Sequence, residues 1–170
     1  MIDGEYKGYY QIDQKYRGGL VELIDSLKSN FDIHLLTGDN DGQKRRLEEQ
    51  FGLKKMRFNQ QPINKLEYIK GLQEKKSHVL MIGDGLNDAG ALKQSDVGIA
   101  ISDDIHQFSP ACDAILEANR LKDLDKYITY SKKATSIVWM SFGLSFLYNI
   151  VGISFAVTGQ LTPIVAAILM

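Results

Sequence analysis

The sequence predicts an α/β fold with a parallel sheet, followed by a helical hairpin that spans a membrane. Short apolar runs that suit buried strands alternate with longer amphipathic stretches that suit helices, and this alternation is typical of parallel sheets. From Ala134 to Met170 the chain holds no charged residue, whereas residues 1–133 hold every Asp, Glu, Lys and Arg. The chain therefore divides into a charged α/β part and an uncharged apolar part.

The elements of the charged part can be placed in order. Residues 1–15 alternate polar and aromatic side chains around Gly4 and Gly8, which is typical of short antiparallel strands. Beyond them, apolar residues at helical spacing and short apolar runs define further elements. We expect helices over residues 17–30, 42–51 and 62–74, and strands over residues 33–36 and 78–82.

The uncharged part predicts membrane-spanning helices. Residues 136–157 are apolar and aromatic and, as a helix, are long enough to cross a bilayer. Gly159 and Gln160 then form a turn, and residues 161–170 begin a second apolar run. The alternative is a buried hairpin of a globular protein, but an α/β domain this small has too little surface to cover it.

Three lysines precede the first span, and by the positive-inside rule they place the charged part in the cytoplasm. They are Lys126, Lys132 and Lys133. The net charge of −1 gives no reason to expect a nucleic-acid partner. Cys112 is the single cysteine, so no disulfide can form within the chain. The three histidines lack the spacing of a zinc site and are interpreted as ordinary strand or loop residues.

A glycine-rich turn carries two carboxylates four residues apart. Asp84 and Asp88 follow the apolar run that ends at Ile82, within the segment G-D-G-L-N-D. Open α/β sheets bind ligands at the carboxyl ends of their strands, where this turn would lie. Mg²⁺ binds through one or two carboxylates with water and substrate phosphate, so the turn predicts a magnesium site. The alternative is an ordinary strand-turn-helix connection in which Asp88 only favours the helix dipole.

Two further motifs lie upstream of this turn. Thr37 and Gly38 follow the strand that ends at Leu36, and a hydroxyl and a close backbone N–H in such a turn suit a phosphate oxygen. Lys65 lies near the start of the helix that begins at Pro62. The helix dipole disfavours a cation there, so Lys65 is either an ordinary solvated lysine or held for an anion.

In the order T-G-D, P-x-x-K and G-D-G-x-N-D-x-x-A-L, these motifs resemble those of the haloacid-dehalogenase superfamily of phosphoryl-transfer enzymes. Within that superfamily the chain is similar to the phosphorylation domain of P-type ATPases. Residues 95–102 and 108–116 match segments of the branch that transports heavy metals. The resemblance covers nearly the whole chain.

The resemblance implies a pump that passes the γ-phosphate of ATP to an aspartate, with Mg²⁺ as cofactor. It implies that Asp84 and Asp88 bind Mg²⁺. It further implies that four residues contact the phosphoryl group: Thr37, Gly38, Lys65 and Asn87. It implies that Asp39, the fifth residue of the catalytic set, serves the hinge between the phosphorylation and nucleotide domains.

The nucleophilic aspartate of this family lies in the motif D-K-T-G-T, which does not occur in this sequence. In the family that motif precedes the nucleotide-binding insertion, and the segment seen here follows it. We therefore expect the carboxyl-terminal part of a larger pump, truncated at both ends, inactive alone and holding an incomplete doubly wound sheet. The expected partners are the missing N-terminal portion (nucleotide, actuator and other transmembrane segments), membrane lipid and the transported metal ion.

The resemblance also divides the chain into expected parts. They are a domain junction over residues 1–15, a phosphorylation domain over 16–118, a stalk helix over 119–135, a transmembrane helix over 136–157 and the start of a second over 161–170. We expect an integral protein of the bacterial cytoplasmic membrane with its soluble part in the cytoplasm. A membrane-anchored phosphatase would need the absent nucleophile, and a nonenzymatic regulator would be expected to lose some of the charged site residues.

Tyr148 and Asn149 are polar residues within the first span, and such residues usually face a transport pathway. Copper pumps of the family carry Tyr-Asn in the corresponding helix, with an asparagine seven residues earlier and a proline five residues later. Here Ser141 and Ser154 occupy those positions, which leaves Zn²⁺ or Co²⁺ open. The variant over residues 108–113 is similar to a subgroup associated with cytochrome oxidase assembly, which favours Cu⁺. A hydrogen bond that packs helices is the alternative role.

Overall fold

The protein is described from a computed structural model, which describes residues 16–103, 111–160 and 162–163. The chain forms two compact units, Met1–Asp125 and Lys126–Met170. The strands expected over residues 1–15 lie outside the described residues, and so does almost all of the second transmembrane helix expected over residues 161–170.

The first unit is built on parallel strands. β1 (His34–Leu36) pairs with β2 (Lys55–Arg57), and β4 (Val97–Ser102) pairs with both β3 (Leu80–Gly83) and β5 (Ala114–Glu117). Every one of these pairs is parallel, so the predicted α/β class with parallel strands is confirmed. The strands form two sheets, one of β1 and β2 and one of β3, β4 and β5.

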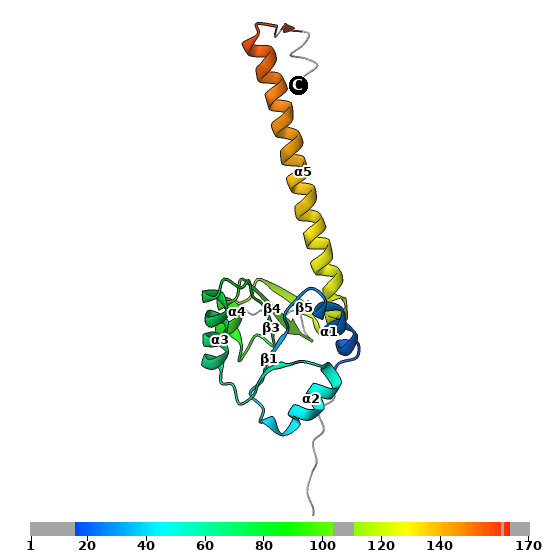
Figure 1. Ribbon diagram of the computed structural model, residues 1–170, viewed down its shortest axis with the longest axis vertical. Coiled ribbons are helices and arrows are strands. Elements are labelled where there is room, and N and C mark those ends of the chain that lie inside the picture. Colours follow the sequence, from blue (N-terminus) through cyan, green and yellow to red (C-terminus); the bar gives the residue numbers. More distant parts are fainter. Residues whose placement is uncertain (1–15, 104–110, 161, 164–170) are drawn as a thin grey trace, which may run out of the picture. The chain divides into compact units, whose positions relative to one another are not determined.

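One α-helix precedes β1 and others lie between successive strands. Among the described residues of this unit the α-helices are α1 (Leu20–Lys28), α2 (Lys44–Phe51), α3 (Pro62–Glu74) and α4 (Ala89–Gln94). Figure 1 shows α3 and α4 on one side of the strands and α1 on the other, and α3 packs against α4. This is the arrangement expected of a doubly wound sheet.

A hydrophobic cluster under α2 holds this part of the unit together. Leu47, Phe51 and Leu53 are buried, and apolar side chains of α1, β1 and β2 pack against them. Tyr16 meets Phe51 edge to face, with ring centroids 5.1 Å apart. Burying a large apolar side chain contributes roughly 1.5–3 kcal/mol, so the cluster fixes β1 and the turn that follows it.

α4 approaches β4 closely, and this fixes the helix that follows the turn carrying Asp84 and Asp88. A Cβ at Gly98 would stand 2.4 Å from the carbonyl oxygen of Leu92, so only glycine fits at this point of β4. The Gly98 N–H donates to Asp113 Oδ2 at 2.7 Å, and the Asp113 N–H donates to the Gly98 carbonyl at 2.8 Å. Leu92 itself is fully buried. At Leu92, α4 is therefore held against β4.

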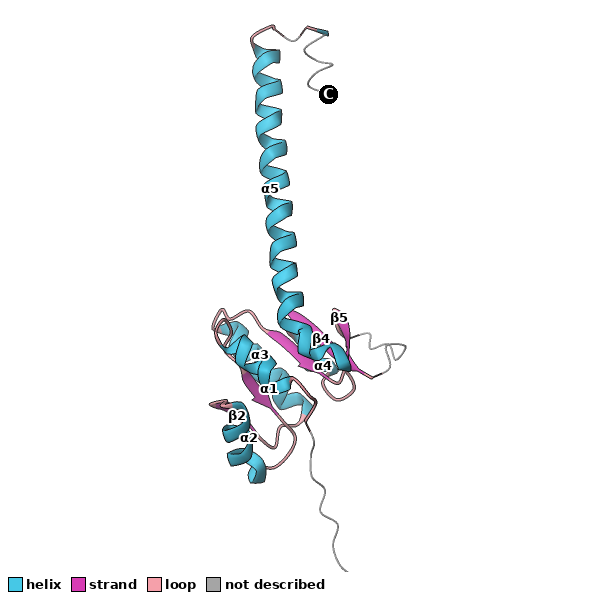
Figure 2. Cartoon of the chain, turned by 90° about the vertical axis from the view of Figure 1, so that its right-hand side faces the viewer, coloured by secondary structure: helices cyan, strands magenta, loops and turns pink. Residues whose placement is uncertain are grey.

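The second unit consists of most of one long helix, α5 (Leu124–Val157), drawn as a single uninterrupted helix in Figure 2. By length and composition the helical stretch Ala118–Val157 can cross a membrane, and its most apolar window has a mean hydropathy of 1.6 with no part buried. Residues 118–123 form a 3₁₀ turn rather than the start of the expected stalk helix. Within the span, Ser141 Oγ donates to the Ile137 carbonyl and Ser154 Oγ to the Ile150 carbonyl.

Some element boundaries differ from those the sequence predicts. α1 begins at Leu20 rather than at Arg17, because Gly19 adopts a left-handed conformation with φ of 82° just before the helix. β3 covers residues 80–83 instead of 78–82. β2 was not predicted, because its single partly buried residue, Met56, stands between exposed Lys55 and Arg57 and gives no periodic pattern.

Candidate active site

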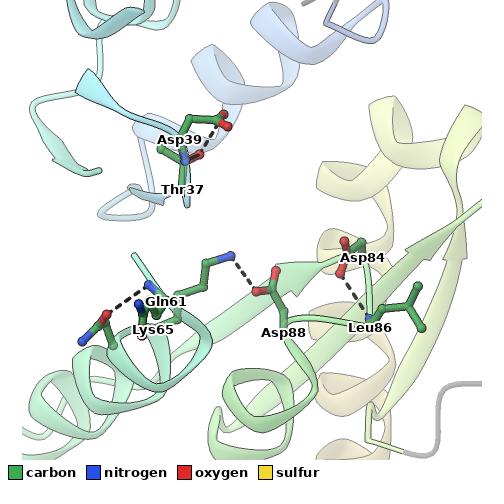
Figure 3. Close-up of polar contacts among 8 residues, drawn as sticks. Thr37, Asp39, Gln61, Lys65, Asp84, Leu86 and Asp88 are labelled. Atoms are coloured by element: carbon green, nitrogen blue, oxygen red, sulfur yellow. Dashed lines mark hydrogen bonds and ion pairs between the residues drawn. The ribbon is translucent and has the colours of Figure 1, made fainter. Parts of the chain in front are cut away.

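Two of the three sequence motifs are in direct contact, because Lys65 of the second bonds to Asp88 of the third. The backbone hydrogen bonds of the T-G-D turn run instead to β2 and to the loop before α3, and β1 belongs to a different sheet from β3. Thr37 follows β1, Asp84 follows β3, and Lys65 lies in the first turn of α3. Figure 3 shows the Lys65 and Asp88 side chains pointing toward one another, with Asp84 on the same turn as Asp88. The sheet edge predicted to bind ligands therefore gathers two carboxylates and one ammonium group.

The turn after β1 is closed by its own side chains. Thr37 Oγ1 donates to Asp39 Oδ2 at 3.1 Å and accepts the Asp39 N–H at the same distance. The Asn59 N–H donates to the Asp39 carbonyl at 2.8 Å, and the Gln60 N–H donates to the Thr37 carbonyl at 2.9 Å. These backbone bonds tie the T-G-D turn to the loop that leads into α3.

The start of α3 is shaped by its first residues. Pro62 is the first helical residue, where its missing N–H costs nothing. The Gln61 N–H donates to Asn64 Oδ1 at 3.0 Å, which closes the helix end. The Lys65 N–H bonds back to the Gln61 carbonyl at 3.2 Å. The first turn of α3, which carries Lys65, therefore begins two residues after Gln60, whose N–H bonds to a carbonyl of the T-G-D turn.

Lys65 and Asp88 form an ion pair between α3 and the start of α4. Lys65 Nζ lies 2.6 Å from Asp88 Oδ1, and the two side chains are 13% and 11% exposed. The ordinary solvated lysine is therefore not what the structure shows. An ammonium group has three N–H donors, so the bond to Asp88 leaves capacity for a second anion.

The turn after β3 presents the second carboxylate to solvent. Asp84 is exposed, and its Oδ1 accepts the Leu86 N–H at 3.2 Å. Gly85 has φ of 83°, a left-handed conformation that glycine adopts without strain. Leu86 and Asn87 are exposed at the tip of the turn. The turn is thus an open loop with one fixed and one accessible carboxylate.

The donors of this turn fit Mg²⁺. Asp84 and Asp88 supply hard carboxylate oxygens, and Mg²⁺ usually binds one or two protein carboxylates and completes its shell with water and phosphate. Among the described residues no group of three or more His, Cys, Asp and Glu side chains gathers that would hold a metal alone. A site of two carboxylates suits this mode of binding.

Two residues at this edge were not singled out from the sequence. Asn64 closes the start of α3, and the signal for it was a polar residue three positions after Gln61. Gly83 is the last residue of β3, and a Cβ at this position would lie only 2.7 Å from Asp88 Oδ2. Its only signal was a glycine directly before the first aspartate of the turn.

The predicted transport residues belong to the second unit. Tyr148 and Asn149 lie on α5 and are exposed among apolar neighbours. Ser141 and Ser154, which stand where the copper pumps carry asparagine and proline, both bond to carbonyl oxygens of their own helix. Such bonds occupy a hydroxyl within its own helix. The two hydroxyl protons are thus engaged within the helix, while both lone pairs of each serine oxygen remain available as acceptors.

Comparison with known proteins identifies relatives of this chain. Residues 1–96 match the family described as haloacid dehalogenase-like hydrolase. Copper-transporting ATPase 2 of Rattus norvegicus is 34% identical over a region that covers 96% of this chain and 12% of the relative. The chain thus spans about one eighth of the length of that relative.

Solved structures give the same picture. The catalytic CPx-ATPase domain CopB-B is 31% identical with a TM-score of 0.59, covering 66% of this chain and 45% of that domain. A zinc-transporting PIB-type ATPase in its E2·Pi state has a TM-score of 0.79 at 21% identity, covering 91% of this chain and 26% of that one. The predicted resemblance to heavy-metal P-type ATPases and the haloacid-dehalogenase-like fold are confirmed.

Proposed function

This chain belongs to the haloacid dehalogenase-like hydrolase family, and from that premise we propose that it is part of an ATP-driven heavy-metal pump that cycles through an aspartyl-phosphate. The observation that carries the proposal is the enclosed ion pair of Lys65 with Asp88, beside the accessible carboxylate of Asp84. The similarity to a copper-transporting ATPase over 96% of the chain supports it.

Lys65 is the cation of the proposed phosphoryl site. Phosphoryl transfer relies mostly on positioning and on electrostatic stabilisation of the charge that spreads over the transferred oxygens. Lys65 Nζ is held in place by Asp88 and little exposed to water, so its charge is only weakly screened. In the proposed reaction it donates to a phosphoryl oxygen and neutralises the developing negative charge.

Asp84 and Asp88 are the proposed ligands of Mg²⁺. When bound, Mg²⁺ would neutralise phosphate charge at this turn. Asp84 is the more accessible of the two carboxylates, whereas Asp88 is 8% exposed and shared with Lys65. We assign direct binding to Asp84 and assign Asp88 the role of holding the metal's surroundings and Lys65 together.

Four further residues have roles in the proposal. The Gly38 N–H and the Thr37 hydroxyl are assigned to a phosphoryl oxygen, for which the Thr37 O–H must turn from Asp39 Oδ2, its acceptor in the structure. The turn that carries them is fixed by backbone bonds from the loop before α3. The exposed Asn87 side chain is assigned as a further donor. Asp39, which caps the Thr37 turn, is assigned to the hinge with a nucleotide-binding domain.

The accepting aspartate of the proposed reaction is not among these 170 residues, because D-K-T-G-T is absent from the sequence. The chain alone should therefore neither hydrolyse ATP nor become phosphorylated. Labelled ATP should leave no acid-stable label on the purified chain. In the proposed division, residues 1–15 form the domain junction, 16–118 the phosphorylation domain, 119–135 the stalk, and 136–157 and 161–170 membrane helices.

The transported ion is proposed to pass along α5. Tyr148 and Asn149 are adjacent polar side chains in a stretch that otherwise holds apolar residues and serines, and polar residues in a span usually mark a pathway. We propose Cu⁺ as the ion, supported by the copper-transporting relative. The soluble unit is proposed to lie in the cytoplasm, since Lys126, Lys132 and Lys133 precede the span.

The test of the proposed function is Asp84→Asn in the full-length pump. Removing an anionic ligand should lower phosphoenzyme formation from ATP at limiting Mg²⁺ by at least about tenfold, since each charge contact at such a site contributes several kcal/mol. Asp41→Asn, which neutralises an exposed carboxylate on the 3₁₀ turn before α2, is the matched control. Phosphoenzyme at the wild-type level in Asp84→Asn would contradict the assignment.

A further inference from the structure

β3 ends in a glycine whose missing side chain makes room for a carboxylate. A Cβ at Gly83 would lie 2.7 Å from Oδ2, 2.9 Å from Cβ and 3.2 Å from Cγ of Asp88. Cβ atoms do not approach other heavy atoms within 3.0 Å in folded proteins without something shifting. The Asp88 side chain therefore occupies the volume that any side chain at Gly83 would need.

Asp88 cannot give way without losing its contacts. Rotation of the side chain would move Oδ2, but the Cβ of Asp88 is fixed by the backbone at the start of α4, where the Leu92 N–H donates to the Asp88 carbonyl at 2.8 Å. The other carboxylate oxygen is held by Lys65 Nζ at 2.6 Å. The residue as a whole is 8% exposed. The carboxylate is thus confined between α3 and the end of β3.

The need for glycine at this position is one of space. Gly83 is not among the glycines with positive φ, so another residue could adopt its backbone conformation. By contrast, a Cβ at Gly71 within α3 would have no heavy atom within 4 Å apart from its chain neighbours and the nearby backbone of its own helix. Alanine at either position reduces the backbone freedom of the chain, but only alanine at Gly83 would clash with another side chain. Comparing the two variants therefore distinguishes a steric effect from an effect of backbone flexibility.

We propose that Gly83 is a positioning residue, whose bare Cα forms the seat that holds the Asp88 carboxylate against Lys65. With this seat filled, Asp88 would be pushed away from the end of β3 and Lys65 would lose its partner. Asp84 follows Gly83 directly, so the same displacement would change the spacing of the two carboxylates. This inference rests on the proposed function in assigning those carboxylates to Mg²⁺.

The experiment compares Gly83→Ala with Gly71→Ala in the full 170-residue chain, purified in detergent with ¹³Cγ-labelled aspartate. The Asp88 resonance is assigned by its loss in Asp88→Asn, and Mg²⁺ is added as the probe. Gly83→Ala should shift the Asp88 resonance before any Mg²⁺ is added and weaken its response to Mg²⁺ at least tenfold. Gly71→Ala should leave both unchanged.

The outcomes separate the two proposals. If the Asp88 resonance of Gly83→Ala stays at the wild-type position, Gly83 does not position the Asp88 carboxylate, whatever the response to Mg²⁺. If the Asp84 and Asp88 resonances of the wild-type chain do not change when Mg²⁺ is added, the metal assignment is wrong. The positioning role of Gly83 is then decided by the spectra recorded without metal.

A second variant covers the case in which Gly83→Ala fails to fold. Asp88→Gly removes all three atoms that the new methyl group would meet. Gly83→Ala combined with Asp88→Gly should therefore fold and melt within a few degrees of Asp88→Gly alone, measured by circular dichroism. If the double variant stays unfolded while Asp88→Gly folds, the Asp88 side chain is not what excludes a methyl group at Gly83, and the proposal is wrong.

Discussion

At the residue scale, the ammonium group of Lys65 is almost enclosed by protein and its charge is balanced by Asp88. Exposed pairs of this kind contribute little, because water screens both charges. Here both side chains are mostly buried, so each charge depends on the other for its stabilisation. The pair links α3 to α4 and keeps a positive charge at the sheet edge where phosphate is proposed to bind.

Lys65→Met should destabilise the first unit. Methionine keeps much of the apolar stem of lysine but leaves Asp88 without its partner, which costs about 1–3 kcal/mol for a mostly buried acceptor. Urea unfolding of the chain, followed by circular dichroism, should show the loss as a lower midpoint. Arg45→Met is the control, because it breaks a pair with Glu49 whose side chains are 92% and 67% exposed. Equal midpoints for the two variants would show that the Lys65 pair carries no special stability.

The partner of Lys65 shows where prediction from the sequence ended. The sequence indicated that a lysine near a helix start was either solvated or held for an anion. Asp88 lies 23 residues away, and the pair forms only because α3 packs against α4. Gly83 was missed for a similar reason, since its requirement comes from a side chain five residues later that folds back over it.

At the scale of the elements, Asp96 joins the end of α3 to the start of β3. Its Oδ2 accepts the Val79 N–H at 2.8 Å and Gln73 Nε2 at 3.2 Å. The bond from the Val79 backbone, followed by that from Gln73, holds the pKa of Asp96 below its usual value of 3.8. These bonds favour the ionised form, because a carboxylate accepts N–H groups better than a carboxylic acid does.

The pH dependence of stability should therefore include Asp96. A pKa that is lowered in the folded state stabilises the fold above the unfolded pKa of 3.8, and this contribution is lost as the pH falls through the lower folded pKa. Asp96→Asn should reduce the fall in melting temperature between about pH 5 and pH 3. Asp41→Asn is the control and should leave the slope unchanged. An Asp96→Asn profile parallel to wild type would contradict the role.

Among the elements, α3 was predicted with its observed ends, because Pro62 begins it and the apolar spacing stops at Glu74. The strands were less well defined. β2 has three residues and only Met56 turned inward, so its place depends on pairing with β1 rather than on its own pattern. The separation of the strands into two sheets likewise depends on tertiary packing.

The long helix α5 should insert into membranes through its apolar stretch. Leu144 lies within that stretch and is 71% exposed. Leu144→Arg should lower insertion, because arginine near the centre of a span costs about 2.5–3.5 kcal/mol. The measurement is the fraction of the chain that stays with membranes after alkaline extraction, with Leu144→Ala as the control. Equal retention of both variants would show that this stretch does not cross the bilayer.

At the scale of the whole molecule, the two units carry different halves of the proposed activity. The loss of all charge after Lys133 predicted an apolar segment separate from the α/β part, and the second unit, Lys126–Met170, contains that segment together with three lysines before it. The identity of the ion was not predictable in the same way. Oxygen ligands such as those of Tyr148 and Asn149 bind soft ions weakly, so they would supplement thiolates supplied from elsewhere.

The last prediction concerns Asn149→Ala in the full-length pump. If Asn149 lies on the ion pathway, this variant should lower metal-stimulated ATP hydrolysis and metal binding. Phosphorylation from inorganic phosphate should persist, because the residues proposed for that step lie in the first unit. Ser141→Ala is the matched control, since the Ser141 hydroxyl bonds to its own helix at 3.0 Å and its loss should leave turnover near wild type.

The ion itself follows from the same assay with Cu⁺, Ag⁺, Zn²⁺, Cd²⁺ and Co²⁺. We expect Cu⁺ and Ag⁺ to stimulate hydrolysis most, because soft monovalent ions prefer the thiolates that Tyr148 and Asn149 would supplement. Stimulation mainly by Zn²⁺ or Co²⁺ would replace copper as the proposed ion while leaving the pump intact. Unchanged kinetics in Asn149→Ala with every metal would show that Asn149 has no role in transport. Its side chain would then serve helix packing, because a polar side chain can stabilise a helix pair through its hydrogen bonds.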